Sequence, residues 1–260
     1  MAKSPRHPKI RDDAATTNFA RSLCGMLCTL FLAAVLTGCS NVTEADFQEG
    51  MDAYARGDFA TAMKKWKPLA EDGNPSAQTN LGVMYYQGRG LDAPNYQEAL
   101  RWYRIAAMQG YPDAQFNLGL AHMEGKGVAR DFEQAVRWYK MAGESGYLQA
   151  QIMLADMYLK GQGVVADQNE AAKWYSLAAD QGSAVAQYVL GNLHIGGKGV
   201  TADLTQAYKW FTIMARTTED ENARGNAERS MEILKERMTQ AQIIQAGNMA
   251  QDWIDARATN

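Results

Sequence analysis

Cysteine, histidine and proline are scarce in this sequence, and the scarcity of cysteine excludes the most. Among 260 residues there are three cysteines, three histidines and six prolines. Cys24 and Cys28 lie in an apolar run near the N-terminus, which leaves Cys39 as the only other cysteine. Without the N-terminal segment, one chain therefore has neither a disulfide framework nor a cysteine metal site. The small number of prolines is compatible with a largely helical chain.

The apolar run near the N-terminus is too short for a membrane-spanning helix. It extends from Leu23 to Val35, whereas a spanning helix needs roughly 18 to 20 residues. The preceding segment, Met1 to Arg21, contains five basic and two acidic residues. A basic start followed by a short apolar run and small residues is typical of a secretory signal. An uncleaved signal anchor is the alternative.

The residues after this run resemble the bacterial lipobox, in which the cysteine is lipidated and becomes the new N-terminus: Leu36-Thr37-Gly38-Cys39. The resemblance implies a lipoprotein signal peptide at 1–38, then a lipidated Cys39 with a tether at 39–44. It also implies a membrane contact through this anchor in the cell envelope. If the host is Gram-negative, Ser40 favours the outer membrane, facing the periplasm.

Charge argues against one class of partner. Removing residues 1–38 takes away five basic and two acidic residues, which changes the formal net charge from −3 to about −6. General nucleic-acid binding needs a basic stripe or patch, and this acidic chain shows none. We therefore expect no nucleic-acid partner.

The rest of the sequence is dominated by one pattern that occurs four times. The copies begin at Ala77, Ala114, Ala150 and Ala186. Their tryptophans are spaced by 36 residues, at Trp102, Trp138, Trp174 and Trp210. A period of this length is typical of stacked helix pairs that each contact only their neighbours.

Each copy is predicted to form two helices joined by a Gly-x-Gly turn. In the first copy they extend roughly over Ser76 to Gln87 and Asn95 to Gln109. A glycine just past the first helix permits a left-handed C-cap. The second helix opens on a capping box, in which two side chains each accept a bond from the other residue's backbone N–H. The four boxes are Asn95/Glu98, Asp131/Gln134, Asp167/Glu170 and Asp203/Gln206.

The two helices of a copy differ in pattern. The second is amphipathic, whereas the first is apolar nearly all round and is therefore predicted to be buried on several sides. We infer that first helices line the inner wall of the array and second helices its outer wall. Trp138 is expected to be buried between the helices of its pair. Close helix approach is expected at a small residue of the first helix, which is Gly82, Gly119, Ala155 or Gly191.

These motifs resemble the Sel-one-like repeat (SLR) family, a relative of the tetratricopeptide repeats. The resemblance rests on A-x-x-x-L-G-x-x-[YH], G-x-G, the acidic or Asn cap, A-x-x-W-[YF] and A-A-x-x-G, from Ala77 to about Ala215. It implies an all-α fold, an α-solenoid of stacked antiparallel helix pairs that form a superhelix. It also implies protein binding and assembly, with no shared chemistry and no cofactor.

Different segments flank the four repeats, which we place at 76–216. Residues 45–75 resemble a plain tetratricopeptide helix pair that caps the array. The alignment puts Trp66 at the position of Tyr103, although Trp66 lies 36 residues before the first repeated tryptophan.

The C-terminal segment, 217–257, does not contain the repeat. It is predicted to form two helices that cover the open end of the fourth repeat, because uncapped arrays lose solubility. The last helix begins at a further capping box, Thr239 with Gln242.

The residues that suggest chemistry are few. His122 and His194 occupy a position that is tyrosine in the other copies, and they lie two repeats apart. That separation is too large for one metal, so half-buried packing is favoured over a metal site. The Gly-Lys-Gly turns lack the spacing of a phosphate-binding loop and are predicted to be helix caps.

Five residues of the first helices are candidates for a concave groove: Tyr86, Phe116, Asp156, Tyr188 and Asn192. Asp156 is the only acid at its helical position; it marks a groove or is simply solvated. The three aromatic residues either pack between repeats or line the groove, where they would also suit a glycan.

The predicted function is a lipid-anchored envelope scaffold for protein–protein interaction or assembly. The alternative is a scaffold for glycan binding, polysaccharide export or cell-wall assembly. We do not expect an enzyme, because no Ser/His/Asp or Cys/His constellation is present and no catalytic residue stands out.

Overall fold

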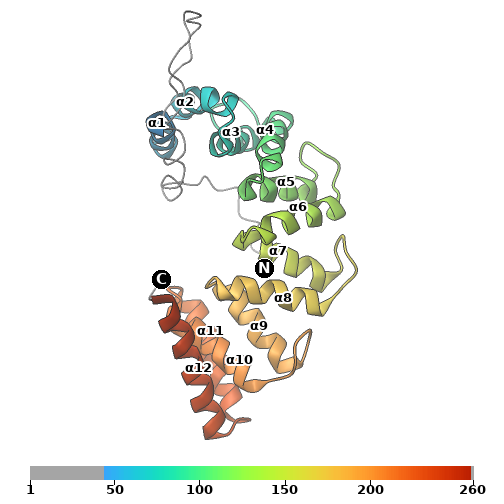
Figure 1. Cartoon of the computed structure of the whole chain (residues 1–260), viewed down its shortest axis with the longest axis vertical. Coiled ribbons are helices and arrows are strands. Elements are labelled where there is room, and N and C mark those ends of the chain that lie inside the picture. Colours follow the sequence, from blue (N-terminus) through green and yellow to red (C-terminus); the bar gives the residue numbers. More distant parts are fainter. Residues whose placement is uncertain (1–43, 259–260) are drawn as a thin grey trace, which may run out of the picture. The chain divides into compact units, whose positions relative to one another are not determined.

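The computed structural model describes residues 44–258, and within this range it contains twelve α-helices and no β-strand (Figure 1). The chain divides into two compact units, Met1–Leu118 and Gly119–Asn260, which we describe separately. The predicted all-α fold is confirmed.

The first unit contains two helix pairs. α1 (Glu44–Ala55) packs against α2 (Phe59–Glu71), and α3 (Pro75–Gln87) packs against α4 (Tyr96–Met108). α2 also contacts α3, which stacks one pair on the next. α5 (Pro112–Glu124) crosses the boundary between the two units.

The second unit continues the same arrangement. Its helices are α6 (Phe132–Glu144), α7 (Leu148–Lys160), α8 (Gln168–Asp180), α9 (Ala184–Gly196), α10 (Leu204–Thr217), α11 (Glu221–Lys235) and α12 (Gln240–Ala258). α7 pairs with α8 and α9 with α10, while α6–α7 and α8–α9 contacts stack successive pairs. The helices therefore form an α-solenoid of antiparallel pairs, as predicted.

In each pair, an aromatic ring of the second helix packs against a small residue of the first helix. A Cβ atom added to Gly82 would lie 2.4 Å from the ring of Tyr103, and one added to Gly191 would lie 2.7 Å from Phe211. Both rings are fully buried. The close approach predicted from the small residues is confirmed, because any larger side chain would push the helices apart.

The turn after the first helix of a pair satisfies that helix end. Gly161 follows α7 with φ of 63°, in the left-handed region. The N–H of Gln162 donates to the carbonyl of Met157 at 3.0 Å. This is the predicted glycine C-cap.

The start of the second helix is capped differently from the prediction. The N-cap side chains accept hydrogen bonds from backbone N–H groups of the first helical turn, as expected. The predicted return bond, from the N-cap N–H to the Glu or Gln side chain, is wrong. The N-cap N–H donates at 2.8–3.0 Å to a carbonyl of the preceding helix: Asn95 to Tyr85, Asp131 to His122, Asp167 to Tyr158 and Asp203 to His194. The short turn brings this carbonyl within reach, so the N–H needs no side-chain acceptor. Thr239 and Gln242, before and within α12, do form the full box.

The second glycine of the turn touches the preceding pair. A Cβ atom added to Gly199 would lie 1.8 Å from the carbonyl oxygen of Gln168, at the start of α8. One added to Gly163 would lie 2.4 Å from the backbone of Phe132, at the start of α6. Glycine is therefore required here for stacking between pairs as well as for its φ of 72–73°.

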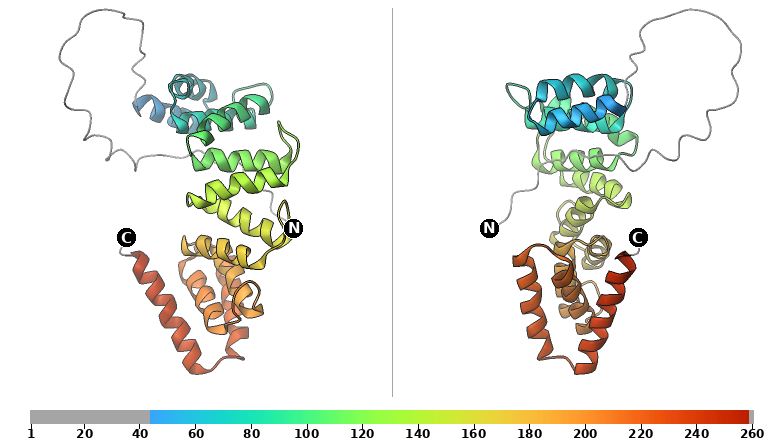
Figure 2. Two further views of the ribbon diagram at one scale, coloured as in Figure 1. Left: turned by 45° about the vertical axis from the view of Figure 1, so that its right-hand side comes forward. Right: turned by 90° about the vertical axis from the view of Figure 1, so that its left-hand side faces the viewer.

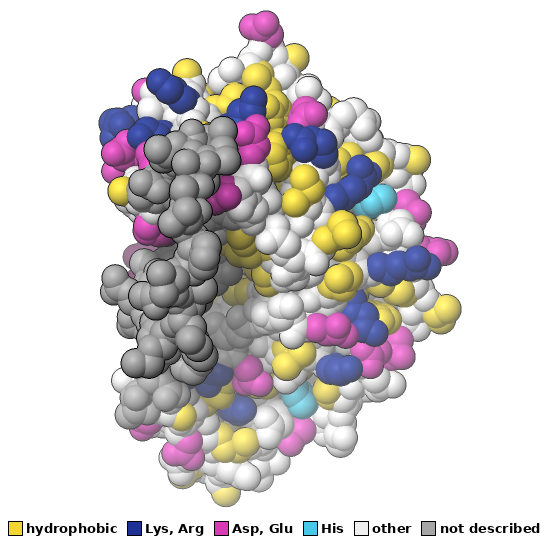
Figure 3. Space-filling model, turned by 45° about the horizontal axis from the view of Figure 1, so that its top comes forward, with side chains coloured by type: hydrophobic (Ala, Val, Ile, Leu, Met, Phe, Trp, Pro, Cys, Tyr) yellow, Lys and Arg dark blue, Asp and Glu magenta, His cyan; other side chains and the backbone are white. Residues whose placement is uncertain are grey.

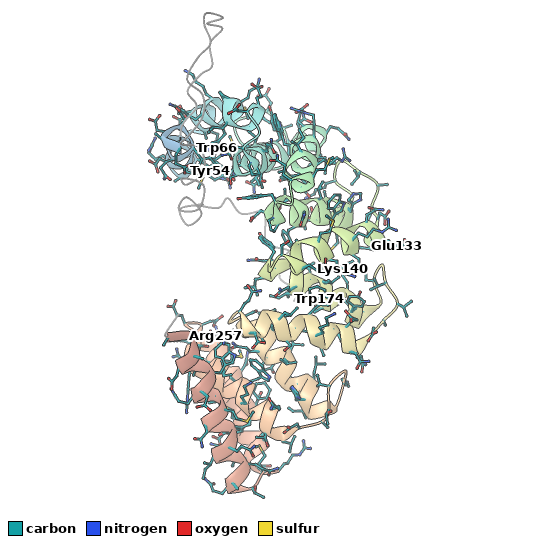
Figure 4. The ribbon with its side chains drawn as sticks, in the orientation of Figure 1. Tyr54, Trp66, Glu133, Lys140, Trp174 and Arg257 are labelled. Atoms are coloured by element: carbon teal, nitrogen blue, oxygen red, sulfur yellow. The ribbon has the colours of Figure 1, made fainter. Side chains whose placement is uncertain are left out.

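The repeated tryptophan packs between pairs. A Cβ atom added to Gly143 of α6 would lie 3.1 Å from the ring of Trp174 (labelled in Figure 4), which belongs to the next pair. Tyr175, the following residue, bonds instead to Asp156 of its own partner helix α7. Adjacent aromatic residues thus serve two different interfaces.

Trp138 differs from the other repeated tryptophans. It is only partly buried, so the prediction that it lies buried between the helices of its pair is wrong. The fully buried ring of that pair is Tyr139, which lies against Gly119. The sequence motif contains both rings side by side, and only the packing distinguishes them.

The α1–α2 pair repeats the design with a tryptophan in place of tyrosine. A Cβ atom added to Gly50 would lie 2.3 Å from Nε1 of Trp66, which is fully buried. The indole N–H donates to the carbonyl of Phe47 at 3.2 Å, and the ring of Tyr54 lies 5.7 Å from that of Trp66 (Figure 4). The predicted equivalence of Trp66 and Tyr103 is confirmed, because each ring lies against a glycine of its partner helix.

α11 and α12 end the second unit without forming such a pair. Both pack against α10, and they diverge from the turn that joins them (Figure 2). Ala227 and Leu234 of α11 and Ala246 of α12 are buried in one cluster with Phe211 and Met214 of α10. Two helices therefore cover the second helix of the last pair.

Candidate interaction surface

A buried glutamine makes the most regular polar contact between stacked pairs, and this contact was not predicted from the sequence. Its side-chain amide donates to a carbonyl of the preceding second helix at 3.0–3.3 Å in four places: Gln78, Gln115, Gln151 and Gln187. All four residues are at most 3% exposed. The recurring Ala-Gln at each repeat start could have identified them. These amides join the repeats and offer nothing to a ligand.

Two of the five groove candidates are buried. Tyr86 is 5% exposed, and its ring lies 5.2 Å from that of Tyr96 and 6.2 Å from that of Tyr103. Phe116 is 8% exposed. The ring contacts of Tyr86 are with α4 of its own pair and not between repeats, and the burial of both residues leaves little ring surface for a glycan.

Asp156 has partners on its own helix pair. It accepts a hydrogen bond from the hydroxyl of Tyr175, and Nζ of Lys160 lies 3.4 Å from its other oxygen. Burial, and then this bond to Asp156, raise the pKa of Tyr175, so the hydroxyl remains a donor. The equivalent ring of the next pair, Phe211, has no hydroxyl to satisfy. Asp156 therefore completes a packing contact.

Tyr188 and Asn192 lie on α9. The Tyr188 ring is partly buried, 5.6 Å from that of Phe211. The Asn192 side chain is exposed and donates to the carbonyl of Tyr188 at 2.9 Å. Among the five candidates, Asn192 is exposed and the Asp156 side chain is 39% exposed.

The two histidines are partly buried, as favoured from the sequence. Nδ1 of His194 lies 3.3 Å from the carbonyl oxygen of Thr201, and burial lowers the pKa of this imidazole. Within residues 44–258, no group of three or more His, Cys, Asp or Glu residues is arranged to hold a metal ion. In the same range, no helix combines the length and hydropathy needed to cross a bilayer.

Apolar side chains recur on the exposed faces of the second helices. Met141 of α6 is 44% exposed and Leu177 of α8 is 42% exposed. In the first unit, Ile105 of α4 is 36% exposed. The residue at the same position of α10, Ile213, is fully buried. The surface visible in Figure 3 mixes apolar side chains with both signs of charge.

A basic side chain accompanies the repeated tryptophan on these faces. Nζ of Lys173 lies 5.7 Å from the ring centroid of Trp174, and Nζ of Lys209 lies 4.2 Å from that of Trp210. Cation–π contacts of this kind stabilise a basic residue on an aromatic face. On α8 this face thus combines the exposed side chains of Lys173 and Leu177 with the ring of Trp174, which is only 3% exposed.

Cys39, the predicted lipidation site, lies outside the described residues. α1 begins at Glu44, shortly after it in the chain.

The four repeats match a known family model. The Sel1 repeat model matches residues 75–111, 112–147, 148–183 and 184–216. These ranges coincide with the helix pairs α3–α4, α5–α6, α7–α8 and α9–α10, except that α10 ends one residue beyond the last range. A comparison with curated protein sequences gave no match.

Two solved structures are similar in sequence and fold. One is a protective antigen present in uropathogenic Escherichia coli strains, displaying an SLR fold, with 30% identity and a TM-score of 0.68. The match covers 82% of this chain and 45% of that one, so the chain spans less than half the length of the antigen. The other is a Sel1 repeat protein from Oxalobacter formigenes, with 28% identity and a TM-score of 0.66 over 82% and 85% of the two chains.

Proposed function

The chain belongs to the Sel1 repeat family, and from this premise we propose that it is a lipid-anchored scaffold of the bacterial cell envelope that binds and assembles protein partners. Members of the family generally serve as protein–protein interaction scaffolds and are typically not enzymes. In the proposal this chain is likewise not an enzyme, and it takes no nucleic acid.

The repeat array carries the scaffold part of the proposal. Its recurring polar groups are used in internal contacts: the N-cap side chains hold helix starts, and the buried glutamines hold neighbouring pairs. Some side chains that differ between copies, such as Met141 and Leu177, lie on exposed faces. Binding specificity in repeat proteins resides in such variable surface residues.

Co-purification tests the scaffold part. The chain would be cross-linked in envelope membranes and isolated under denaturing conditions. The expected result is a small set of specific protein partners that remain after competition with untagged chain. Recovery of only abundant envelope proteins, equally with an unrelated lipoprotein, would reject the scaffold proposal.

The anchor part is supported by the sequence Leu36-Thr37-Gly38-Cys39 after a short apolar run. A lipid on Cys39 would hold the repeats close to the membrane surface, because only a few residues separate it from α1. A single acyl chain gives weak membrane binding, whereas several chains give stable attachment. Since Ser40 follows the cysteine, the outer membrane is the proposed location in a Gram-negative host.

Metabolic labelling with a fatty-acid probe tests the anchor. The natural chain should incorporate the probe and sediment with membranes, whereas Cys39→Ser should do neither. Cys28→Ser is the matched control, since it removes a cysteine of the signal segment, and it should label normally. Equal labelling of the Cys39→Ser chain would refute the anchor without affecting the scaffold role.

A glycan-binding or polysaccharide-export role is the alternative from the sequence. Two of the aromatic residues that suggested it, Tyr86 and Phe116, are buried, and Tyr188 packs on Phe211. No contact in residues 44–258 favours this alternative over protein binding. A solution screen against peptidoglycan and exopolysaccharide fragments would revive it if one fragment bound saturably.

A further inference from the structure

α12 lies over the face of α10 that is exposed on the other second helices. Its Gln251 side chain accepts from Arg216 of α10 at 2.9 Å, and its Trp253 ring lies 6.2 Å from that of Trp210. Ile213 lies between these two α10 residues, three positions from each, so it shares their side of the helix. It is fully buried, although Leu177, its equivalent on α8, is 42% exposed. This face of α10 is therefore a helix-docking site that α12 occupies.

The contact face of α12 consists of small residues and one aromatic anchor. Ala246 and Ala250 are fully buried, and their small side chains let α12 approach closely. The indole N–H of Trp253 donates to Asp180 of α8 at 3.2 Å, and Arg257 lies 4.0 Å from the same oxygen. The occupied site thus has a basic residue on a tryptophan, an apolar residue one turn later, and an acid on the preceding second helix.

The same set of residues occurs a second time, one repeat earlier. Moving back 36 positions from Lys209, Trp210, Ile213 and Asp180 leads to Lys173, Trp174, Leu177 and Glu144. The side chains of Leu177 and Glu144 are 42% and 58% exposed. Glu144 is held only by a surface ion pair to Lys140 at 3.9 Å, which contributes little.

The two sets also have matching backbone frameworks. The amide of Gln151 donates to the carbonyl of Gly143 at 3.0 Å, and that of Gln187 donates to Ala179 at 3.3 Å. Since the same contact joins α6 to α7 and α8 to α9, Glu144 stands to α8 as Asp180 stands to α10. The set does not occur in the repeat before that one, because Met108 stands at the position of Glu144 and Asp180.

We propose that the exposed side chains of Lys173, Leu177 and Glu144, together with the buried Trp174 beneath them, form a docking site for an amphipathic helix of a partner protein. By analogy with α12, the partner helix would place small side chains against Leu177. It would also carry a tryptophan that donates to Glu144 and an arginine one turn after that tryptophan. Its position is continuous with the α12 interface, because Asp180 follows Leu177 on the same face of α8. The inference rests on the proposed scaffold role and specifies one surface for it, independently of the lipid anchor.

Fluorescence anisotropy tests the site with a labelled peptide of the α12 sequence, Gln240–Ala258, added to the purified full chain. Saturable binding is expected, and Leu177→Glu should weaken it at least about tenfold. Glu144→Gln should weaken it several-fold. Val165→Glu is the matched control, since Val165 is 89% exposed in the turn before α8, and it should bind normally. Absence of saturable binding up to about 1 mM peptide would overturn the proposal.

Two further measurements establish where the peptide binds and which molecule occupies the site. A photo-reactive group at the peptide position of Ala250 should cross-link to α8 and α6; cross-links only to α10 would mean that the peptide replaces α12, which overturns the proposal. Light scattering of the chain alone should show a monomer. A dimer that Leu177→Glu abolishes would identify a second copy as the occupant and overturn the partner-protein assignment.

The peptide result and the scaffold role can fail separately. Loss of peptide binding while specific envelope partners are still recovered would reject this site alone. Failure to recover specific partners with both the natural chain and Leu177→Glu would reject the scaffold role.

Discussion

The matched repeats and the two C-terminal helices are held in different ways. Within the repeats, a ring against a small residue joins each pair, and a buried amide with a turn glycine joins successive pairs. α11 and α12 have none of these motifs, and each packs separately on α10. The comparison indicates that repeated contacts set the spacing of the array, whereas the end is closed by helices whose contacts occur once.

Removing the end should have the largest effect. A chain ending at Ala215 exposes Tyr208, Phe211 and Met214, which are now at most 5% exposed. We expect it to aggregate or oligomerise, because uncapped arrays lose solubility. Size-exclusion chromatography with light scattering measures this. A chain ending at Arg237, which keeps α11, should remain monodisperse but melt earlier; a monodisperse, cooperatively melting chain ending at Ala215 would show that the helices are not a cap.

Replacing a glycine that lies between stacked pairs should lower the free energy of unfolding more than replacing a glycine that only forms a turn. Gly199→Ala places a Cβ atom 1.8 Å from a backbone oxygen at a φ of 72°, so we expect a cost of at least about 3 kcal/mol. Gly182 has a φ of 89° and nothing within 4 Å of an added Cβ. Gly182→Ala should therefore cost only about 1–2 kcal/mol, from the left-handed backbone. Urea denaturation compares the two, and equal costs would contradict the stacking role.

Much of this architecture could be predicted from the sequence, because recurrence reveals which residues are constrained. The helix starts followed from short polar N-caps, the turns from glycine, and the close approach from small residues such as Gly82. Helix α3 begins at Pro75, one residue before the predicted Ser76. The equivalence of Trp66 and Tyr103 required aligning the pair as a whole, since matching tryptophan to tryptophan would have been wrong.

The failures have physical causes that a single sequence does not reveal. Asp131 and its equivalents lost the predicted reciprocal bond because a carbonyl across the turn competes for the N–H. Trp138 and Tyr139 are both large aromatic residues, and only the positions of neighbouring helices decide which is buried. Tyr86 shows the same limit for the groove, because periodicity places it on a helix without stating which neighbour covers it.

A buried amide between repeats should contribute less than the stacking glycine. Gln151→Leu removes the donor to the carbonyl of Gly143 and the acceptor for Gln181, at 3.0 and 2.8 Å. The carbonyl of Gly143 keeps its bond from the N–H of Gly146, so the loss of two side-chain hydrogen bonds predicts a decrease of about 1–3 kcal/mol in the free energy of unfolding. Gln181→Leu is the matched control at an exposed position, and it should lose no more than about 1 kcal/mol. A larger loss for the control would place the important contact at the surface instead.

The smallest expected effect is on the pH dependence of stability. It concerns Tyr158 and His194, which occupy equivalent positions in the third and fourth repeats. Burial lowers the pKa of His194 below its ordinary 6.5. In the pH range between the two values the unfolded chain binds more protons, so the stability present above pH 6.5 decreases as the pH falls. His194→Tyr, which copies the third repeat, should remove this part of the pH dependence, whereas Tyr158→His should add to it. Thermal melts of the three chains between about pH 7.5 and about pH 5.5 compare the slopes; a steeper fall in His194→Tyr than in the natural chain would show that the imidazole is stabilised in its charged form.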